Sequence, residues 1–364
     1  FFTIAKSWCD FCRYARKYKG KNIRTRSQVL IDDTILIDFG PDTYMHSLQY
    51  DISLADIYHC LITHTHDDHL YVEDLRARRR SRANLDLGTP TLTVYGGRGV
   101  KEVLKPDDNG FVTKDKSIFY QPVYDYSPFY IEDKYEIIPI SSIHNTTNPL
   151  VYVIRKDDSV FLYAHDTDVL SEESFLYLKS KNIRFDAISL DCTEGIKHID
   201  YPGHMNFERM KIMCDLMRTY NLIDLDTKII ANHFSHNGLI SYDDAVIKGN
   251  ELGYIISYDG MILNIWGIWM KLIVFTGPPA SGKSSLSSDI AKDLKIDCIS
   301  KDLFKMHLFD KYGFKSHDEK KLLSIKGEAM MYRVIKFYIS RNKDLIIDNN
   351  FKEFDTLRSL LNTN

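Results

Sequence analysis

His64-Thr65-His66-Asp67-Asp68-His69 places four candidate metal ligands within six residues, directly after the apolar run at 59–63. That run predicts a short buried strand, so the ligands begin where the strand ends. The spacing requires a loop that folds back, with the first two imidazoles on one side and Asp68 and His69 on the other. Imidazole and carboxylate without thiolate suit zinc, manganese or iron(II) at a site that keeps positions open for water. The pattern HxHxDH therefore predicts a metal centre.

The same motif is the hallmark of the metallo-β-lactamase superfamily, which this sequence resembles. In that superfamily a lone His, an acidic residue and a last His follow later strands, and the matching residues are His144, Asp166 and His233. The resemblance implies an α/β fold, an αββα sandwich, with two divalent ions, zinc or manganese. One ion would be held by His64, His66 and His144. The other would be held by Asp68, His69 and His233, with Asp166 bridging the two.

Two residues beside these ligands receive different interpretations. Asp38 matches a structural Asp of the superfamily, and the resemblance implies that it braces the ligand loop from behind. His165 is adjacent to Asp166, but neighbouring side chains of a strand point to opposite faces. We therefore leave His165 out of the ligand set.

The carboxylate at position 166 narrows the chemistry. It gives two similar, hard, bridged ions, whereas a thiolate would favour the asymmetric site of true β-lactamases. Two bridged ions can generate a hydroxide at neutral pH and neutralise the oxygens of a phosphoryl centre. The same pair could hydrolyse a thioester or a lactone, so the ions alone leave the substrate open.

Residues near both ends of this domain resemble one branch, the phosphoribosyl cyclic phosphate phosphodiesterases. In that branch three Cys and one His, which lies three residues after the last catalytic ligand, hold a separate structural zinc. Cys9, Cys12 and His236 match this set, and Ser7 stands where the remaining Cys would be. The resemblance implies a structural zinc here, and two buried reduced thiols are the alternative. Tyr258-Asp259-Gly260-Met261 resembles the C-terminal strand of this branch, and the apolar run at 261–265 is strand-like.

His204, in Gly203-His204-Met205-Asn206, matches the catalytic His of the same branch, which is not a metal ligand. An imidazole there can donate a proton to the leaving alkoxide or to a phosphoryl oxygen. Apolar residues at helical spacing predict a helix over 207–220, and its N-terminus favours negative charge. We therefore predict His204 and Asp68 as catalytic residues of this domain.

Arginines offer two further hypotheses about phosphate. Arg24 or Arg26 lies where the branch places Arg-containing sequence and could bind a terminal phosphate. A basic run follows the metal motif, and its members are Arg76, Arg78, Arg79, Arg80 and Arg82. This run is interpreted as a solvated helix face or as a patch that steers phosphate.

Strand-like and helical patterns alternate along the first 265 residues. Two apolar runs around Asp32-Asp33 predict a hairpin, and the runs at 151–154 and 160–163 predict another. The run at 228–230 is again strand-like. Strands mixed with helices in this way indicate a layered α/β domain.

Composition limits the class of protein. The chain has 364 residues, 44% of them apolar and 27% charged, which is typical of a soluble globular protein of one to three domains. Six Cys in a chain of this length do not form a disulfide framework, and no apolar run would span a bilayer, so we expect a cytoplasmic protein. Neither an initiator Met nor a signal peptide is present, so we expect a short segment to precede Phe1.

Charge is distributed unevenly. The first 270 residues carry 30 Lys and Arg against 38 Asp and Glu, and the remainder carries 17 against 12. An acidic hydrolase half argues against nucleic acid as a partner. The expected partners are a small phosphorylated substrate and a nucleotide, without a membrane, and the sequence leaves a homodimer open.

The C-terminal segment contains the P-loop pattern GxxxxGK[ST] at 277–284, between a strand-like run and a helical one. Such a loop binds ATP or GTP with Mg²⁺ through Gly277, Gly282, Lys283 and Ser284. Asp302 follows a second strand-like run, as in small-molecule and polynucleotide 5′-hydroxyl kinases, and the resemblance implies that it is the catalytic base. The lid that such kinases carry is not visible in these 94 residues, so binding without catalysis is the alternative.

These patterns predict two domains. Residues 1–267 form the metallo-β-lactamase-fold hydrolase, and residues 271–364 form a partial P-loop NTPase α/β domain. The preferred function is a dimetal phosphodiesterase acting on a small cyclic or linear sugar phosphate, fused to a kinase-like module. One alternative is an RNA-end-processing phosphodiesterase and kinase. Another is a hydrolase of lactones or thioesters with a regulatory nucleotide-binding module.

Overall fold

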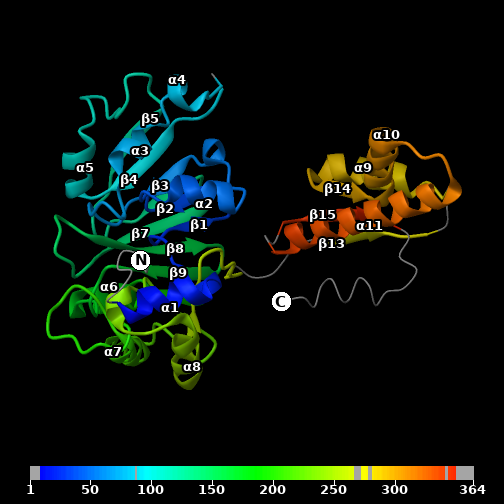
Figure 1. The fold of residues 1–364 in the computed structure, drawn as a ribbon. Coiled ribbons are helices and arrows are strands. Elements are labelled where there is room, and N and C mark those ends of the chain that lie inside the picture. The colour runs from blue at the N-terminus through cyan, green and yellow to red at the C-terminus, as the bar shows by residue number, and fades with distance from the viewer. Residues whose placement is uncertain (1–8, 87, 266–271, 278–280, 341–342, 350–364) are drawn as a thin grey trace. The chain divides into compact units, whose positions relative to one another are not determined.

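The structure is a computed structural model that describes residues 9–86, 88–265, 272–277, 281–340 and 343–349. The chain divides into two compact units, Phe1–Met261 and Ile262–Asn364, and each is described by itself (Figure 1). The predicted linker at 268–270 lies outside the described residues.

The first unit contains two β-sheets, of which one has five strands in the order β1-β2-β3-β4-β5. These strands are β1 (Val29–Ile31), β2 (Ile35–Ile37), β3 (His59–Leu61), β4 (Leu92–Gly96) and β5 (Ile118–Pro122). β1 and β2 form the predicted hairpin, and its Asp32 and Asp33 have φ of 47° and 60°. Positive φ at both central residues is what a type I′ turn requires. β2 to β5 run parallel.

The other sheet has seven strands in the order β12-β11-β10-β9-β8-β7-β6. The strands are β6 (Phe129–Ile131), β7 (Tyr135–Ser141), β8 (Leu150–Lys156), β9 (Ser159–Ala164), β10 (Ala187–Asp191), β11 (Lys228–Asn232) and β12 (Ile255–Ile256). β8 and β9 form the second predicted hairpin. β9 to β12 are parallel, and β7 has the same direction because it is antiparallel to β8. The carboxyl ends of β7, β9, β10 and β11 therefore lie at one edge.

Side chains of the seven-stranded sheet alternate between two buried environments. Val151 and Val153 of β8 pack in one core with residues of α6 (Glu172–Ser180) and α7 (Phe207–Thr219). Tyr152 lies between them in sequence and points to the other face, where its hydroxyl donates to the carbonyl of Ile62 at 2.7 Å. Burial on both faces explains why the strand is apolar throughout rather than alternating in polarity.

Helices cover the outer face of each sheet. The seven-stranded sheet packs against α6, α7, α1 (Asp10–Tyr18) and α8 (Tyr242–Leu252). The five-stranded sheet is covered by α2 (Thr43–Gln49), α3 (Val72–Arg76), α4 (Arg80–Ala83) and α5 (Arg98–Leu104), with Leu75, Val100 and Leu104 in its core. Figure 1 shows these two groups of helices on opposite sides of the paired sheets. The first unit thus has four layers, α, β, β and α.

The second unit contains a parallel sheet in the order β13-β15-β14. Among the described residues of this unit, the strands are β13 (Leu272–Phe275), β14 (Asp297–Ser300) and β15 (Leu345–Asp348). The helices described there are α9 (Lys283–Leu294), α10 (Lys301–Tyr312) and α11 (His317–Ser340). Met331 and Ile335 of α11 form a small core with Ile299 and Leu345. Among the described helices, none is both long enough and apolar enough to cross a membrane.

One prediction about the end of the first unit is wrong. Neither the stretch 258–261 nor the apolar run at 261–265 forms a strand, and the backbone turns at 258–261. The N–H of Met261 donates to the carbonyl of Tyr258, and Gly260 between them has a φ of 81°. Asp259 in this turn accepts hydrogen bonds from the backbone N–H and hydroxyl of Thr25 at 2.8 and 2.7 Å. Asp259 and Gly260 therefore stabilise a turn, although the apolar residues beside them are typical of a strand.

We expect Tyr152→Phe to lower the free energy of unfolding of the first unit by about 1–3 kcal/mol, the usual cost of leaving a buried acceptor unpaired. Chemical denaturation followed by near-UV circular dichroism measures the change. Tyr130→Phe is the matched control, since Tyr130 lies in β6 and is 64% exposed. If the two substitutions lowered the free energy of unfolding equally, the hydrogen bond from Tyr152 to Ile62 would not contribute to stability as expected.

Candidate metal centre

The loop that follows β3 folds back as its spacing requires. The backbone N–H groups of His69 and Leu70 both donate to the carbonyl of His66 at 2.9 Å. This tight turn separates the first two imidazoles of the motif from Asp68 and His69. The remaining candidates follow strand ends at the edge described above: His144 after β7, Asp166 after β9 and His233 after β11.

His64, His66, His144 and Asp166 form a first group that could hold an ion. The Nδ1 atom of His66 lies 3.1 Å from the Nε2 atoms of both His64 and His144. Nε2 of His64 lies 3.2 Å from Oδ2 of Asp166. Ligands about 2.0–2.1 Å from a tetrahedral zinc are roughly 3.3 Å apart, so these separations suit a shared ion.

Asp68, His69, Asp166 and His233 form a second group. Nε2 of His69 lies 2.7 Å from Oδ2 of Asp166 and 3.1 Å from Nε2 of His233. Asp68 is more distant, with its Oδ2 atom 3.9 Å from Nε2 of His69. Asp166 belongs to both groups, so the structure brings the seven predicted ligands together around one buried carboxylate.

The second ring nitrogen of four ligands is engaged by the protein. Nδ1 of His69 lies 2.7 Å from Oδ2 of Asp38, and Nδ1 of His144 lies 2.9 Å from the carbonyl of Gly203. The hydroxyls of two threonines fill the same role at the other two ligands, with Thr63 3.0 Å from His64 and Thr193 2.6 Å from His233. Each hydrogen bond fixes the ring and leaves Nε2 to face the centre.

Asp38 braces the ligand loop, as the resemblance implies. Its Oδ1 atom accepts hydrogen bonds from the backbone N–H and the hydroxyl of Thr63 at 2.8 and 2.9 Å. Asp38 is fully buried and has a φ of 67°, in the left-handed region that non-glycine residues rarely adopt. Asp166 and His233 share this conformation with φ of 49° and 61°. Left-handed backbone thus recurs at three positions of the centre.

Charges at the centre compensate one another. Burial lowers the pKa of His64 to about 4, which favours the neutral imidazole that a metal ion needs. Burial also opposes charge on His69, but the carboxylates of Asp166 and Asp38 raise its pKa well above the usual value. The pKa of Asp166 itself is held well below its usual value, because His233 and His69 outweigh the effect of burial. Metal ions binding here would displace the proton from His69.

His204 lies beside the centre, in the loop before α7. Its Nδ1 atom is 3.2 Å from Oδ1 of Asp166 and 3.3 Å from Oδ2 of Asp191. Burial opposes its protonation, but these two carboxylates raise the pKa of His204 to about 10. His204 also joins a third group with Asp166, Asp191 and His233 that could hold an ion.

Asp191 is a site residue that sequence reasoning missed. It ends β10, is fully buried, and accepts hydrogen bonds from the backbone N–H groups of Asp166, Thr193 and Met205 at 3.0, 2.9 and 2.9 Å. It thereby ties the loops that carry the bridging carboxylate and His204. One signal in the sequence could have identified Asp191, namely its position at the end of a buried strand. The neighbouring strands β9 and β11 are likewise followed by metal ligands, Asp166 and His233.

Cys9, Cys12 and His236 form a separate group that could hold a metal ion. Nδ1 of His236 lies 3.6 Å from Sγ of Cys9 and 3.3 Å from Sγ of Cys12. Ser7, the candidate for the fourth position, lies outside the described residues. The structure therefore places together three of the four atoms that a structural zinc requires.

Arg24 and Arg26 both contact other residues of the protein. Arg24 is buried with its guanidinium 4.4 Å from the ring centre of Phe234, and Arg26 pairs with Asp42 at 2.9 Å. Within the basic run, Arg78 is buried, so neither the solvated face nor the steering patch describes it. His165, between Ser27 and Ser189 at 2.7 Å from each hydroxyl, is a buried histidine with both ring nitrogens paired.

The predicted P-loop, residues 277–284, lies between β13 and α9 of the second unit. Gly277 and Gly282 have φ of 150° and 81°, Gly282 caps the helix, and Lys283 and Ser284 begin it. Residues 278–280 lie outside the described residues. Asp302 lies in the first turn of α10, where its exposed carboxylate pairs with Lys305 at 2.9 Å.

Comparison with known proteins agrees with this architecture. Residues 33–223 match the Beta-lactamase superfamily domain, and the chain therefore belongs to the metallo-β-lactamase superfamily, whose members are generally metal-dependent hydrolases. No curated protein matches the chain in sequence.

Solved structures share the fold of the first unit. A new diphosphatase of the PhnP family is 19% identical, with a TM-score of 0.51 over 70% of this chain and 87% of its own. Zinc-bound PqqB from Methylobacterium extorquens is 17% identical, with a TM-score of 0.52 over 71% and 93%. The metallo-β-lactamase fold protein YhfI from Bacillus subtilis is 16% identical, with a TM-score of 0.51 over 65% and 91%.

We expect the purified chain to hold about two tightly bound divalent ions, or about three if the cysteine group is filled. Asp166→Ala should reduce the content of the two ions at the metal centre, because this carboxylate belongs to both ligand groups. His165→Gln is the control and should leave it unchanged, since His165 contacts two serine hydroxyls instead. Elemental analysis by mass spectrometry measures all three proteins, and full metal content in Asp166→Ala would contradict the bridging role.

Proposed function

We propose that the first unit is a dimetal phosphodiesterase whose two ions are bridged by Asp166. The observation that carries this proposal is the position of that carboxylate, 2.7 Å from His69 of one ligand group and 3.2 Å from His64 of the other. Bound there, two ions would supply a nucleophilic hydroxide and would neutralise charge on a phosphoryl group. Zinc and manganese both suit ligands that are imidazoles and carboxylates.

The protein's own residues would contribute orientation and a proton. Four ligand imidazoles are held through their second ring nitrogen, so their Nε2 atoms are already directed at the centre before ions or substrate bind. His204 is half-buried at the same centre, and although burial opposes its protonation, the neighbouring carboxylates of Asp166 and Asp191 raise its pKa. A protonated imidazole can donate to the departing alkoxide oxygen of a phosphodiester.

A small sugar phosphate, cyclic or linear, is the substrate that we favour. The acidic balance of the first 270 residues disfavours a polyanion such as RNA. The resemblance of Cys9, Cys12, His204 and His236 to the phosphoribosyl cyclic phosphate phosphodiesterases points to the same class. The similarity to the PhnP-family diphosphatase is one of fold, and it is compatible with phosphoester chemistry.

A panel of substrates tests this choice. Ribosyl cyclic phosphates should be hydrolysed faster than 2′,3′-cyclic nucleotides, and lactones should be hydrolysed least. Release of product is followed by chromatography with the metal-loaded chain. Preferential hydrolysis of lactones would instead support the generic hydrolase.

His204→Ala should reduce turnover by about 10²- to 10⁴-fold, the usual contribution of a positioned acid. Its metal content should stay unchanged, because both ligand groups are complete without it. His198→Ala is the matched control, since His198 lies exposed in the same loop and should leave turnover unchanged. Loss of metal from His204→Ala would show that this residue is a ligand.

For the cysteine group we propose a structural zinc held by Cys9, Cys12 and His236. The position of His236 supports this assignment, because it is three residues after the ligand His233 and near both sulfurs. An ion there would tie α1 to the turn that carries His233.

For the second unit we propose binding of ATP or GTP with Mg²⁺, without efficient phosphoryl transfer. The order strand, glycine-containing loop and helix supports binding, since the first N–H groups of α9 and Lys283 would face the phosphates. Phosphoryl transfer needs cations over the γ-phosphate and a free base. The proposed base, Asp302, is paired with Lys305 on the surface of α10.

Lys283→Ala should abolish nucleotide binding and leave phosphodiesterase activity intact. Isothermal titration calorimetry with ATP and Mg²⁺ measures binding, and Lys292→Ala, in the last turn of the same helix, is the control. Absence of binding to the unmodified chain would refute the nucleotide site. Phosphoryl transfer at about 1–100 s⁻¹, the rate of active kinases, would refute the proposal that this unit transfers phosphate inefficiently.

A further inference from the structure

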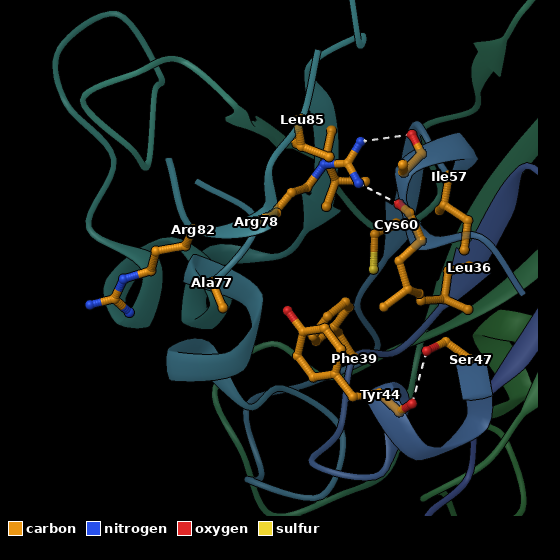
Figure 2. A pocket seen from close by; sticks show the side chains of 14 residues that line it. Leu36, Phe39, Tyr44, Ser47, Ile57, Cys60, Ala77, Arg78, Arg82 and Leu85 are labelled. Carbon is orange, nitrogen blue, oxygen red and sulfur yellow. Dashed lines mark hydrogen bonds between the residues drawn. The ribbon is translucent and has the colours of Figure 1, made fainter. Parts of the chain in front are cut away.

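A cavity lies on the helical side of the five-stranded sheet, away from the strand ends that carry the metal ligands. It has a volume of about 430 Å³ and is bordered by β2 to β4, α2, the 3₁₀ turn Leu54–Asp56, and the segment from Ala77 to Leu85. Figure 2 shows its wall, in which Leu36, Phe39, Ile57 and Cys60 face Ala77 and Arg78. This volume is within the range of pockets that hold small organic ligands.

The interior is largely apolar, and its neutral polar groups are satisfied. The hydroxyl of Tyr44 donates to the carbonyl of Asp74 at 3.1 Å, and that of Ser47 donates to the carbonyl of Tyr44 at 2.8 Å. Burial raises the pKa of the Cys60 thiol well above its usual value, so this group is uncharged. A ligand would therefore meet mainly hydrocarbon here.

Two arginines, Arg78 and Arg82, bring positive charge to the wall, and Arg78 is the buried one. The residue is only 7% exposed, and its guanidinium donates to the backbone carbonyls of Leu54, Ala55 and Pro90. Its Nε atom is buried and has no hydrogen-bond partner. Within the described part of the chain no carboxylate pairs with it. Carbonyl oxygens hold the guanidinium in place but supply no countercharge, and a buried unpaired ion is costly.

We propose that this cavity binds a small amphipathic carboxylic acid, with its hydrocarbon chain against Leu36, Ile57 and Leu92 and its carboxylate beside Arg78. Hydrocarbon gains from leaving water in an apolar cavity, and the carboxylate supplies a countercharge close to the guanidinium. The site is separate from the metal centre, because Asp38 directs its side chain to His69 while its neighbours Leu36 and Phe39 line the cavity.

Calorimetric titration of the full, metal-loaded chain with decanoate tests the proposal. Decanol matches the chain without the charge, and acetate matches the charge without the chain. Decanoate is expected to bind at one site, about tenfold or more tightly than either. Equal affinity for decanoate and decanol, or no binding of decanoate, would overturn the proposal.

Variants locate the bound acid. Arg78→Gln removes the charge but keeps amide donors, and it should reduce the affinity for decanoate to that for decanol. Arg82→Gln is the control, since Arg82 also borders the cavity but is exposed, and Figure 2 shows its guanidinium directed away from Arg78; binding should persist. Loss of binding in this control but not in Arg78→Gln would refute the role of Arg78.

Two further variants separate the remaining explanations. Ala77→Phe should fill the cavity and abolish binding, which decides the matter even if Arg78→Gln fails to fold by circular dichroism. Persistence of binding in Ala77→Phe would place the acid elsewhere. Asp166→Ala should still bind decanoate, and loss of binding there would mean that the acid occupies the metal centre.

Discussion

The carboxylate of Asp166 lies almost wholly out of water, and the first unit is arranged to compensate its charge. It has imidazoles on three sides, those of His64, His69 and His204, at 3.2, 2.7 and 3.2 Å. A buried carboxylate is stable only beside positive charge. Without ions that charge comes from protons on His69 and His204, whose pKa values are raised. Divalent ions would supply it more fully, and the neutral His64 already has the form that an ion requires.

Orientation of the imidazoles follows from two similar hydrogen-bonded units. The hydroxyl of Thr63 donates to Asp38, and that of Thr193 donates to Asp191, each at 2.9 Å. A hydroxyl has one proton, so each threonine must accept from its histidine, His64 or His233, at Nδ1. Both rings therefore carry the proton on Nδ1 and present an Nε2 lone pair to the centre. Each buried aspartate thus controls a metal ligand through a threonine.

Sequence reasoning succeeded where the signal is local. The hairpins, the helix α7 and the turn in the metal motif depend on neighbouring residues, and the structure confirms them. It missed Asp191, whose role arises only when β10 lies between β9 and β11, and it could not show that Arg78 is buried. The strand predicted at the close of the first unit is absent, because the turn at Gly260 and the hydrogen bonds of Asp259 outweigh a short apolar pattern. The charge of Arg78 does not reveal that the residue is buried, because the groups that bind its guanidinium are backbone carbonyls remote in the sequence.

Backbone strain at the metal centre arises because the ligand side chains must be directed toward one another. Asp38, Asp166 and His233 all occupy the left-handed region, which costs a residue with a side chain of the order of 1–3 kcal/mol. Each is held there by a specific acceptor or donor. The N–H of Asp166 donates to Asp191, and that of His233 donates to the side chain of Asn232 at 2.7 Å. A strand that continued in extended form would direct these side chains away from the centre, since alternate residues face opposite layers. The left-handed residue follows the end of each strand and turns a side chain toward the shared edge. The site therefore depends on strain that Asp191 maintains at Asp166 and that Asn232 maintains at His233.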